Sequence, residues 1–224
     1  METKRLNEKK ISIIGPLLVL AVGVLLIVDY GKRSPVENSG DSIKWSAEQV
    51  KNDLVKGKID LEFQKYFDRD PERKVPDQKN IIVAPADGLV TGVTKDQDGV
   101  TIIIHLSLFD VHVQRVPISG KVTNIEHVGN GYFSAKDPQY LNGVQTVTTI
   151  TTAVGEVKVK QITALFTTRI QTYPKVGDTM RIGDRLGQIL LGSTVIVILP
   201  DNTNIMVRPG DKVYGAETVI ANYR

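Results

Sequence analysis

Cysteine is absent from this sequence, and histidine occurs only three times. The lack of cysteine excludes disulfide bonds, thiolate catalysis and metal sites built from cysteine ligands. A strong charge of one sign is also missing, since 28 lysines and arginines face 25 aspartates and glutamates. The net charge of +3 gives no reason to expect a nucleic-acid partner, although it suits an anionic membrane surface or an anionic ligand.

One long uncharged run is present, at residues 11–28 (ISIIGPLLVLAVGVLLIV). A helix of this length is close to the shortest that crosses a bilayer core. No small-x-small cleavage site follows it, because the run ends in DYGKR. We therefore predict that residues 1–30 form an uncleaved membrane anchor at the cell membrane rather than a signal peptide or a buried core helix. Basic residues flank the run on both sides, so the membrane side of the catalytic domain stays open.

Residues 31–78 are predicted to hold a polar linker and a short amphipathic helical region. The sequence SAEQ at residues 46–49 has the spacing of a capping box, and apolar residues follow it at roughly helical intervals. This region could lie on the membrane surface, or it could cover the core of the domain that follows, which we favour.

Residues 79–224 are predicted to form a mostly β domain, because β-branched runs alternate there with turn signals. The runs are residues 81–83, 100–106, 111–113, 144–151, 157–159, 162–166 and 195–199. Segments 175–187 and 208–220 share a Gly-Asp pattern and indicate a partial internal repeat. Since Gly-Asp pairs set tight turns, we expect a compact β-sandwich similar to the barrel-sandwich hybrids of carrier domains. A biotinyl or lipoyl carrier would also present a lysine at a hairpin tip, and none is convincingly placed.

Few residues outside the apolar runs could do chemistry. His112 alternates with valines on both sides and is predicted to point away from them, either into solvent or into a cleft. Asp110 lies two residues away on the same strand face, and Asp87 lies in the turn APADG. His105 ends an apolar run, which favours a hydrogen-bonded core histidine.

Gly192 and Ser193 interrupt two apolar runs near the carboxyl end. One interpretation is a turn between buried strands, with the hydroxyl groups bound to nearby backbone. The other is chemical, because a serine that follows a glycine can attack the carbonyl of that glycine. The residues alone leave both interpretations open.

Five stretches together resemble the phosphatidylserine decarboxylases in order and spacing, over residues 66 to about 202. They are FDRDPERKVPD (67–77), APADGLV (84–90), LFDVHVQRVPISGKV (108–122), QITALFTTRI (161–170) and GDRLGQILLGSTVIVILP (183–200). The resemblance implies a proenzyme that cuts itself between Gly192 and Ser193. Chains 1–192 and 193–224 would remain together as a heterodimer, which could assemble further.

The resemblance also implies a cofactor made from the chain itself. Ser193 would become a covalent pyruvoyl group, form a Schiff base with the amine of phosphatidylserine and accept electrons as carbon dioxide leaves. Phosphatidylethanolamine would be the product, and no metal is expected. His112 is the histidine best placed as general acid or base, and Asp87 matches the aspartate of the ADG turn of the family. A related serine ether lipid, archaetidylserine, is an alternative substrate, and an unprocessed, non-catalytic membrane-tethered homologue is an alternative function.

Arg115 stands where the longer branch of the family has a second histidine. That branch uses the histidine with the ADG aspartate to activate the serine, whereas shorter, archaeal-type members resemble this sequence in having the arginine. The base for self-cleavage could therefore be His112 or Asp87, or cleavage could depend on strain and oxyanion stabilisation. Arg115 is expected to bind the carboxylate or the phosphate of the substrate.

Overall fold

A computed structural model describes residues 67–224 apart from positions 98, 108, 134–138, 165–168 and 191–192. In this part of the chain the predicted β character is confirmed, because strands follow one another from residue 81 to residue 223. The predicted membrane anchor at residues 1–30 and the amphipathic helical region up to residue 66 lie outside the described residues. No helix among the described residues is long and apolar enough to span a bilayer.

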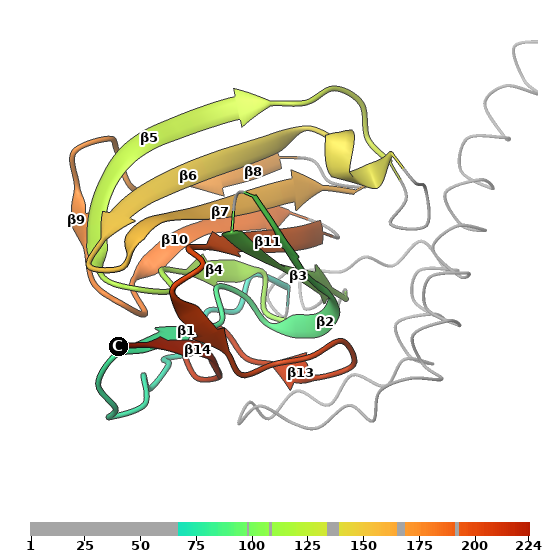
Figure 1. The fold of residues 1–224 in the computed structure, drawn as a ribbon. Coiled ribbons are helices and arrows are strands. Elements are labelled where there is room, and N and C mark those ends of the chain that lie inside the picture. Colours follow the sequence, from blue (N-terminus) through green and yellow to red (C-terminus); the bar gives the residue numbers. More distant parts are fainter. Residues whose placement is uncertain (1–66, 98, 108, 134–138, 165–168, 191–192) are drawn as a thin grey trace, which may run out of the picture. The chain divides into compact units, whose positions relative to one another are not determined.

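The largest sheet is antiparallel and curled, and it has eight strands in the order β13-β2-β3-β11-β7-β6-β5-β9 (Figure 1). The strands are β13 (Lys212–Val213), β2 (Gly88–Asp96), β3 (Gly99–Leu106), β11 (Ser193–Leu199), β7 (Gly155–Thr163), β6 (Gln145–Thr152), β5 (Gly120–Val128) and β9 (Thr179–Met180). A short 3-10 helix, η1 (Tyr140–Asn142), precedes β6. The order gives β11 a neighbour on each side, β3 and β7, along almost its whole length.

Two three-stranded antiparallel sheets complete the domain. One consists of β1 (Ile81–Val83), β14 (Val219–Tyr223) and β12 (Thr203–Ile205), and the other of β4 (Val113–Arg115), β10 (Arg185–Leu190) and β8 (Arg169–Thr172). Strands β10 and β11 are consecutive in the chain but belong to different sheets. The chain therefore changes sheets between residues 190 and 193.

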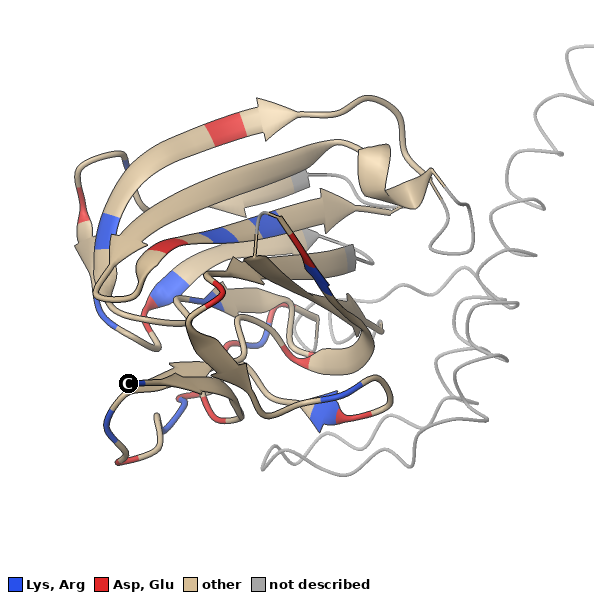
Figure 2. Cartoon of the chain, viewed as in Figure 1, with Lys and Arg blue, Asp and Glu red and all other residues tan. Residues whose placement is uncertain are grey.

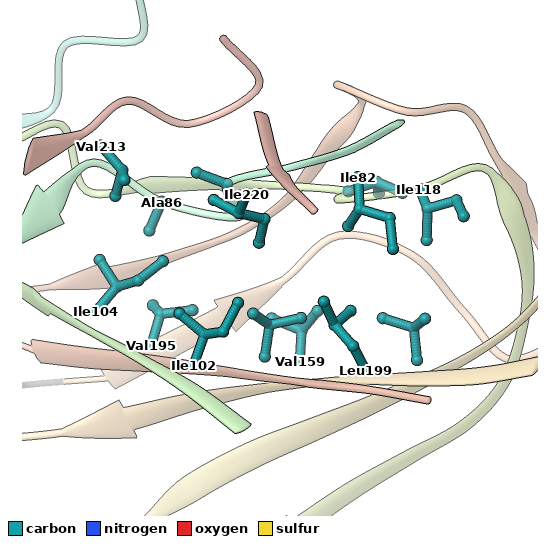
Figure 3. Packing of buried hydrophobic residues seen from close by; sticks show 14 of the residues in the cluster. Ile82, Ala86, Ile102, Ile104, Ile118, Val159, Val195, Leu199, Val213 and Ile220 are labelled. Carbon is teal, nitrogen blue, oxygen red and sulfur yellow. The ribbon is translucent and has the colours of Figure 1, made fainter. Parts of the chain in front are cut away.

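Aliphatic side chains fill the space between the largest sheet and the sheet of β1, β14 and β12. Figure 3 shows two facing rows of buried residues, one with Ile82, Ile118 and Ile220 and the other with Ile102, Val195 and Leu199. Strand β3 has the expected period of two, since Ile102 and Ile104 are fully buried while Ile103 and His105 are partly exposed. Each such aliphatic side chain contributes about 1.5–3 kcal/mol through its burial.

The predicted internal repeat is confirmed by its hydrogen bonds. In the turn 175–178 the Asp178 carboxylate accepts the Lys175 backbone N–H at 2.9 Å, and Gly177 has a φ of 102°, which glycine tolerates best. The N–H of Gly177 donates to the carbonyl of Val122, and the N–H of Val122 donates to the carbonyl of Asp178. The same bonds recur in turn 181–184 against Val116 and in turn 208–211 against Val90.

A fourth turn, at residues 214–218, has one residue more. Ala216 takes the glycine position with a φ of 66° and exchanges the equivalent backbone bonds through Ala84, whose N–H donates to the carbonyl of Thr218. The Thr218 hydroxyl accepts the Tyr214 backbone N–H at 2.8 Å, as a carboxylate does in the other turns. Compared with turn 181–184, the inserted residue is Glu217.

The segments that receive these turns are also repeated. Residues 82–90 (IVAPADGLV) and 114–122 (QRVPISGKV) have proline, glycine and valine at the same positions. Their bonds are reciprocal, because the N–H of Val83 donates to the carbonyl of Pro117 and the N–H of Arg115 donates to that of Pro85. This alignment makes Ser119 the counterpart of Asp87.

Candidate active site

Ser193 is the first residue of β11, and the backbone register pairs it with Leu106 of β3 and Thr163 of β7. Its predicted partner Gly192 lies outside the described residues. The apolar strand thus includes Ser193 and Thr194 instead of beginning after them. The hydroxyl of Thr194 lies 3.5 Å from Nδ1 of His105, a half-buried histidine that has its pKa lowered by burial.

The chain leaves β3 directly beside Ser193 and enters a tight loop. There the Asp110 carboxylate accepts the N–H of Ser107 at 2.7 Å and its hydroxyl at 2.8 Å, and it forms an ion pair with Lys212. The main-chain carbonyl of Asp110 then accepts a hydrogen bond from Nδ1 of His112 at 2.8 Å. Asp110 and His112 both precede β4, so the predicted shared strand face is wrong, and Asp110 instead holds the histidine through its backbone carbonyl.

His112 is completely buried, which excludes solvent, one of the two surroundings that the sequence left open for it. Because a carbonyl only accepts hydrogen bonds, Nδ1 carries the proton and Nε2 is the acceptor. Nε2 has no hydrogen-bond partner among the described residues. Burial lowers the pKa of His112 to about 4, against the opposite effect of Asp110. The imidazole is neutral near pH 7 and presents an unused lone pair.

The backbone of His112 is also fixed to the strand that precedes the Gly192-Ser193 bond. Its carbonyl accepts the N–H of Ile189 in β10 at 3.2 Å and the Gln114 side-chain amide at 2.8 Å. Gln114 in turn accepts a hydrogen bond from buried Gln161 of β7 at 2.8 Å. His112 is thus bound directly to β10. Through the side chains of Gln114 and Gln161 it is also connected to β7, a neighbour of β11.

Asp87 lies in the turn between β1 and β2, with a side chain that is only 6% exposed. One carboxylate oxygen accepts the N–H of Gly215 at 2.7 Å, and the other forms an ion pair with Arg73 at 2.8 Å. Burial raises the pKa of Asp87 above its ordinary value. The charge of Arg73 and the N–H of Gly215 act in the opposite direction, whereas the charge of Asp110 raises the pKa further.

Arg115 ends β4, and protein groups already surround its guanidinium. It forms an ion pair with Asp70 and donates to the carbonyls of Pro71 at 3.0 Å and Gly183 at 3.4 Å. Its side chain is 5% exposed. A substrate anion would therefore have to replace Asp70 at this guanidinium.

One segment, residues 67–76, contacts three predicted site residues that the structure buries, namely His112, Arg115 and Asp87. We call this segment the strap. The Phe67 ring packs on His112, Asp70 pairs with Arg115, and Arg73 pairs with Asp87. Figure 2 shows acidic and basic residues intermixed across the described part of the chain, and the strap follows this pattern. The sequence placed these residues in the linker and helical region, residues 31–78, that precedes the predicted β domain. The alternation of charges in FDRDPER was the available signal for ion pairs.

The fold and this site define a β protein with a buried imidazole, a buried carboxylate and a serine at the start of a central strand. The family model for phosphatidylserine decarboxylase matches residues 61–221, and the chain belongs to this family.

Curated relatives agree with this assignment. The chain is 37% identical over 167 residues to the phosphatidylserine decarboxylase proenzyme of Symbiobacterium thermophilum, which covers 70% of this chain and 78% of the relative. It is 34% identical over 182 residues to a protein of Methanothermobacter thermautotrophicus that is provisionally named an archaetidylserine decarboxylase proenzyme, with 73% and 82% of the two chains covered. A Methanococcoides burtonii protein with the same provisional name is 38% identical over 156 residues, covering 70% of this chain and 73% of that relative.

Proposed function

We propose that this protein is a self-processing, pyruvoyl-dependent decarboxylase that converts phosphatidylserine to phosphatidylethanolamine and carbon dioxide. The family match over residues 61–221 carries this proposal. Archaetidylserine is the alternative substrate, because relatives with either lipid in their names match the chain with similar identity.

Self-cleavage starts at the serine hydroxyl. Ser193 Oγ attacks the carbonyl carbon of Gly192, and the peptide C–N bond breaks as an ester C–O bond forms. Loss of the Ser193 α-proton then releases residues 1–192 as a carboxylate and leaves a dehydroalanine at position 193. Water converts the dehydroalanine to a pyruvoyl group and ammonia. A base must take the hydroxyl proton in the first step, and the buried carboxylate of Asp87 is our candidate.

Several features of the described residues suit such a group. Position 193 is the end of a strand with neighbours on both sides, so a new amino terminus there stays in register. A pyruvoyl group supplies a carbonyl that takes up the substrate amine and the electrons left when carbon dioxide departs. Nε2 of His112, which has no hydrogen-bond partner in the described part of the chain, accepts and returns a proton during decarboxylation. Arg115 exchanges Asp70 for the carboxylate or phosphate of the substrate.

Strand pairing supports a heterodimer of chains 1–192 and 193–224. The shorter chain would contain β11, β12, β13 and β14. Of these, β11 bonds to β3 and β7, β13 bonds to β2, and β14 bonds to β1. The pieces would separate only when these sheets unfold. We further propose that this domain is a barrel-sandwich hybrid and that residues 1–30 anchor it to the cell membrane, where the lipid substrate resides.

Intact mass and denaturing electrophoresis of the full chain, expressed with membranes, test the proposal. We expect two chains, a cut after Gly192, a pyruvoyl group at position 193, and release of carbon dioxide from phosphatidylserine vesicles. Ser193→Ala should give one inactive chain, whereas Ser119→Ala, a matched serine in the same domain, should be processed. An intact, unmodified wild-type chain would contradict the proposal. The same measurement of carbon dioxide release from archaetidylserine vesicles identifies the preferred lipid.

A further inference from the structure

The internal repeat allows Asp87 to be compared with a counterpart in the same molecule. Ser119 Oγ accepts the N–H of Ile182 at 2.8 Å, and Asp87 accepts the N–H of Gly215 at 2.7 Å. Both side chains therefore cap the second turn of their own copy. Since a serine performs this capping in one copy, the cap alone does not require a carboxylate in the other.

The additional oxygen of Asp87 binds Arg73 of the strap. The Arg73 side chain is 5% exposed, so both members of this ion pair have lost most of their hydration. Removing two charges from water costs free energy that their attraction often fails to return, and a buried ion pair is weak evidence for stability. The ion pair between Arg73 and Asp87 is more readily explained by its effect on the orientation and charge of the Asp87 carboxylate.

A second difference between the two copies of the repeat, the inserted Glu217, also contacts Arg73. Glu217, the residue inserted in turn 214–218, accepts a hydrogen bond from the other guanidinium nitrogen of Arg73 at 3.0 Å. It also receives the backbone N–H of Lys74 at 3.5 Å. The two features that distinguish this copy from its counterpart, a carboxylate for serine and an inserted glutamate, thus hold one guanidinium between them.

We propose that Arg73, held by Glu217, is a positioning residue that orients the Asp87 carboxylate and keeps it ionised for self-cleavage at Gly192-Ser193. This inference rests on the proposed function. It goes further by assigning a role to the strap, which lies far from Ser193 in sequence.

The charges that face Asp87 give the proposal a pH signature. Arg73 approaches from the strap, the Gly215 N–H from turn 214–218, and Asp110 from the loop after β3, where it is paired with Lys212. Glu217 acts through Arg73. With the arginine removed, burial and Asp110 both favour the protonated carboxyl, and the hydrogen bond from the Gly215 N–H is left to oppose them. Asp87 would then lose its proton only at higher pH.

The experiment measures the rate of self-cleavage of the full chain between pH 5 and pH 9. We expect Arg73→Gln to move the acid limb upward by about 1 to 3 pH units, the usual effect of losing an adjacent opposite charge. Cleavage at low pH should therefore slow by about tenfold or more and recover toward the wild-type rate at high pH. Arg73→Lys keeps the charge but loses the two-pronged geometry, so its limb should move less and in the same direction.

Arg185→Gln is the matched control. Arg185 pairs with Asp70 and Glu72 of the same strap and does not pair with Asp87 in the described part of the chain, so the acid limb of Arg185→Gln should stay at the wild-type pH. A uniform loss of rate at every pH, an unmoved limb, or an equal shift in Arg185→Gln would overturn the proposal. If Arg73→Gln does not fold, Arg73→Lys decides, and a wild-type limb in that variant overturns it. A wild-type chain that never cleaves would instead refute the proposed function.

Discussion

The ring of Phe67 lies over the imidazole of His112, with ring centroids 4.1 Å apart and the planes tilted by 33°. Phe67 belongs to the strap and His112 to the loop before β4, so the contact joins two segments distant in sequence. Phe67 is itself 4% exposed and shields the histidine from water.

Phe67→Ala should therefore raise the pKa of His112 from about 4 toward the ordinary histidine value, because water can then solvate the imidazolium. Titration of the imidazole proton signals by NMR, in a Ser193→Ala background, measures this directly. His105 is the internal control, since it contacts Thr194 and its pKa should change little. An unchanged His112 titration would show that Phe67 does not control its hydration.

His112 should also make the domain less stable in acid. Its pKa is lower in the folded chain than in the unfolded chain, so the unfolded state takes up the proton first as the pH falls. The stability is fully present above pH 6.5 and declines until about pH 4, by about 3 kcal/mol for a shift of this size. Urea unfolding of Ser193→Ala with and without His112→Gln checks this. A difference between the two proteins that is constant from pH 7 to pH 4 would contradict it.

Asp87 and His112 should affect different steps. Asp87→Asn keeps an oxygen that can accept the Gly215 N–H but removes the basic carboxylate, so we expect a single uncleaved chain. His112→Gln should still be cleaved but should lose decarboxylation by about a hundredfold or more, the usual cost of removing a general acid or base. Electrophoresis and carbon dioxide release measure the two steps separately. Cleavage of Asp87→Asn at the wild-type rate would rule out this carboxylate as the base.

The repeated turns predict a cost for substitution at their glycines. Gly210 has a φ of 100°, and a Cβ added there would meet no atom within 4 Å, so Gly210→Ala tests backbone strain alone. We expect its free energy of unfolding to fall by about 1–3 kcal/mol. Gly177 has a φ of 102° and equally open surroundings, so we expect the same loss for Gly177→Ala. Thermal or urea unfolding that matches the parent protein would show that the turn relaxes without cost.

Strands with strong apolar runs were predictable from the sequence. The runs at residues 81–83, 100–106 and 195–199 lie in β1, β3 and β11, and the run at residues 144–151 overlaps β6. The run at residues 157–159 and the beginning of the run at 162–166 lie in one strand, β7. The predicted run at residues 111–113 was misplaced, since β4 begins at Val113. Strand β5 gave no signal because its side chains are mostly exposed, with Val122 the buried exception. Its pairing with β6 depends on contacts that a local pattern does not carry.

The site was less predictable than the strands. Asp87 and His112 were singled out as polar residues among apolar runs and turns, and the resemblance to a family supplied their roles and that of Arg115. The structure shows that all three are buried. Their partners in the strap were not foreseen, because an ion pair such as Asp70–Arg115 joins residues whose separation along the chain is set by the whole fold. The pattern around His112 left solvent and a cleft both open, and Phe67, the residue of the strap that covers it, is likewise distant in sequence.

The change of sheets between β10 and β11 has a mechanical consequence. Strands on either side of residues 191–192 have their partners in separate sheets, so the covalent link there joins two hydrogen-bonded ladders rather than two strands of one hairpin. A cut between residues 192 and 193 would remove a tether and leave both ladders with their partners. It would also create a new chain end inside the eight-stranded sheet, between β3 and β7. A terminus that approached the folded sheet from solvent could reach this position only by displacing a strand.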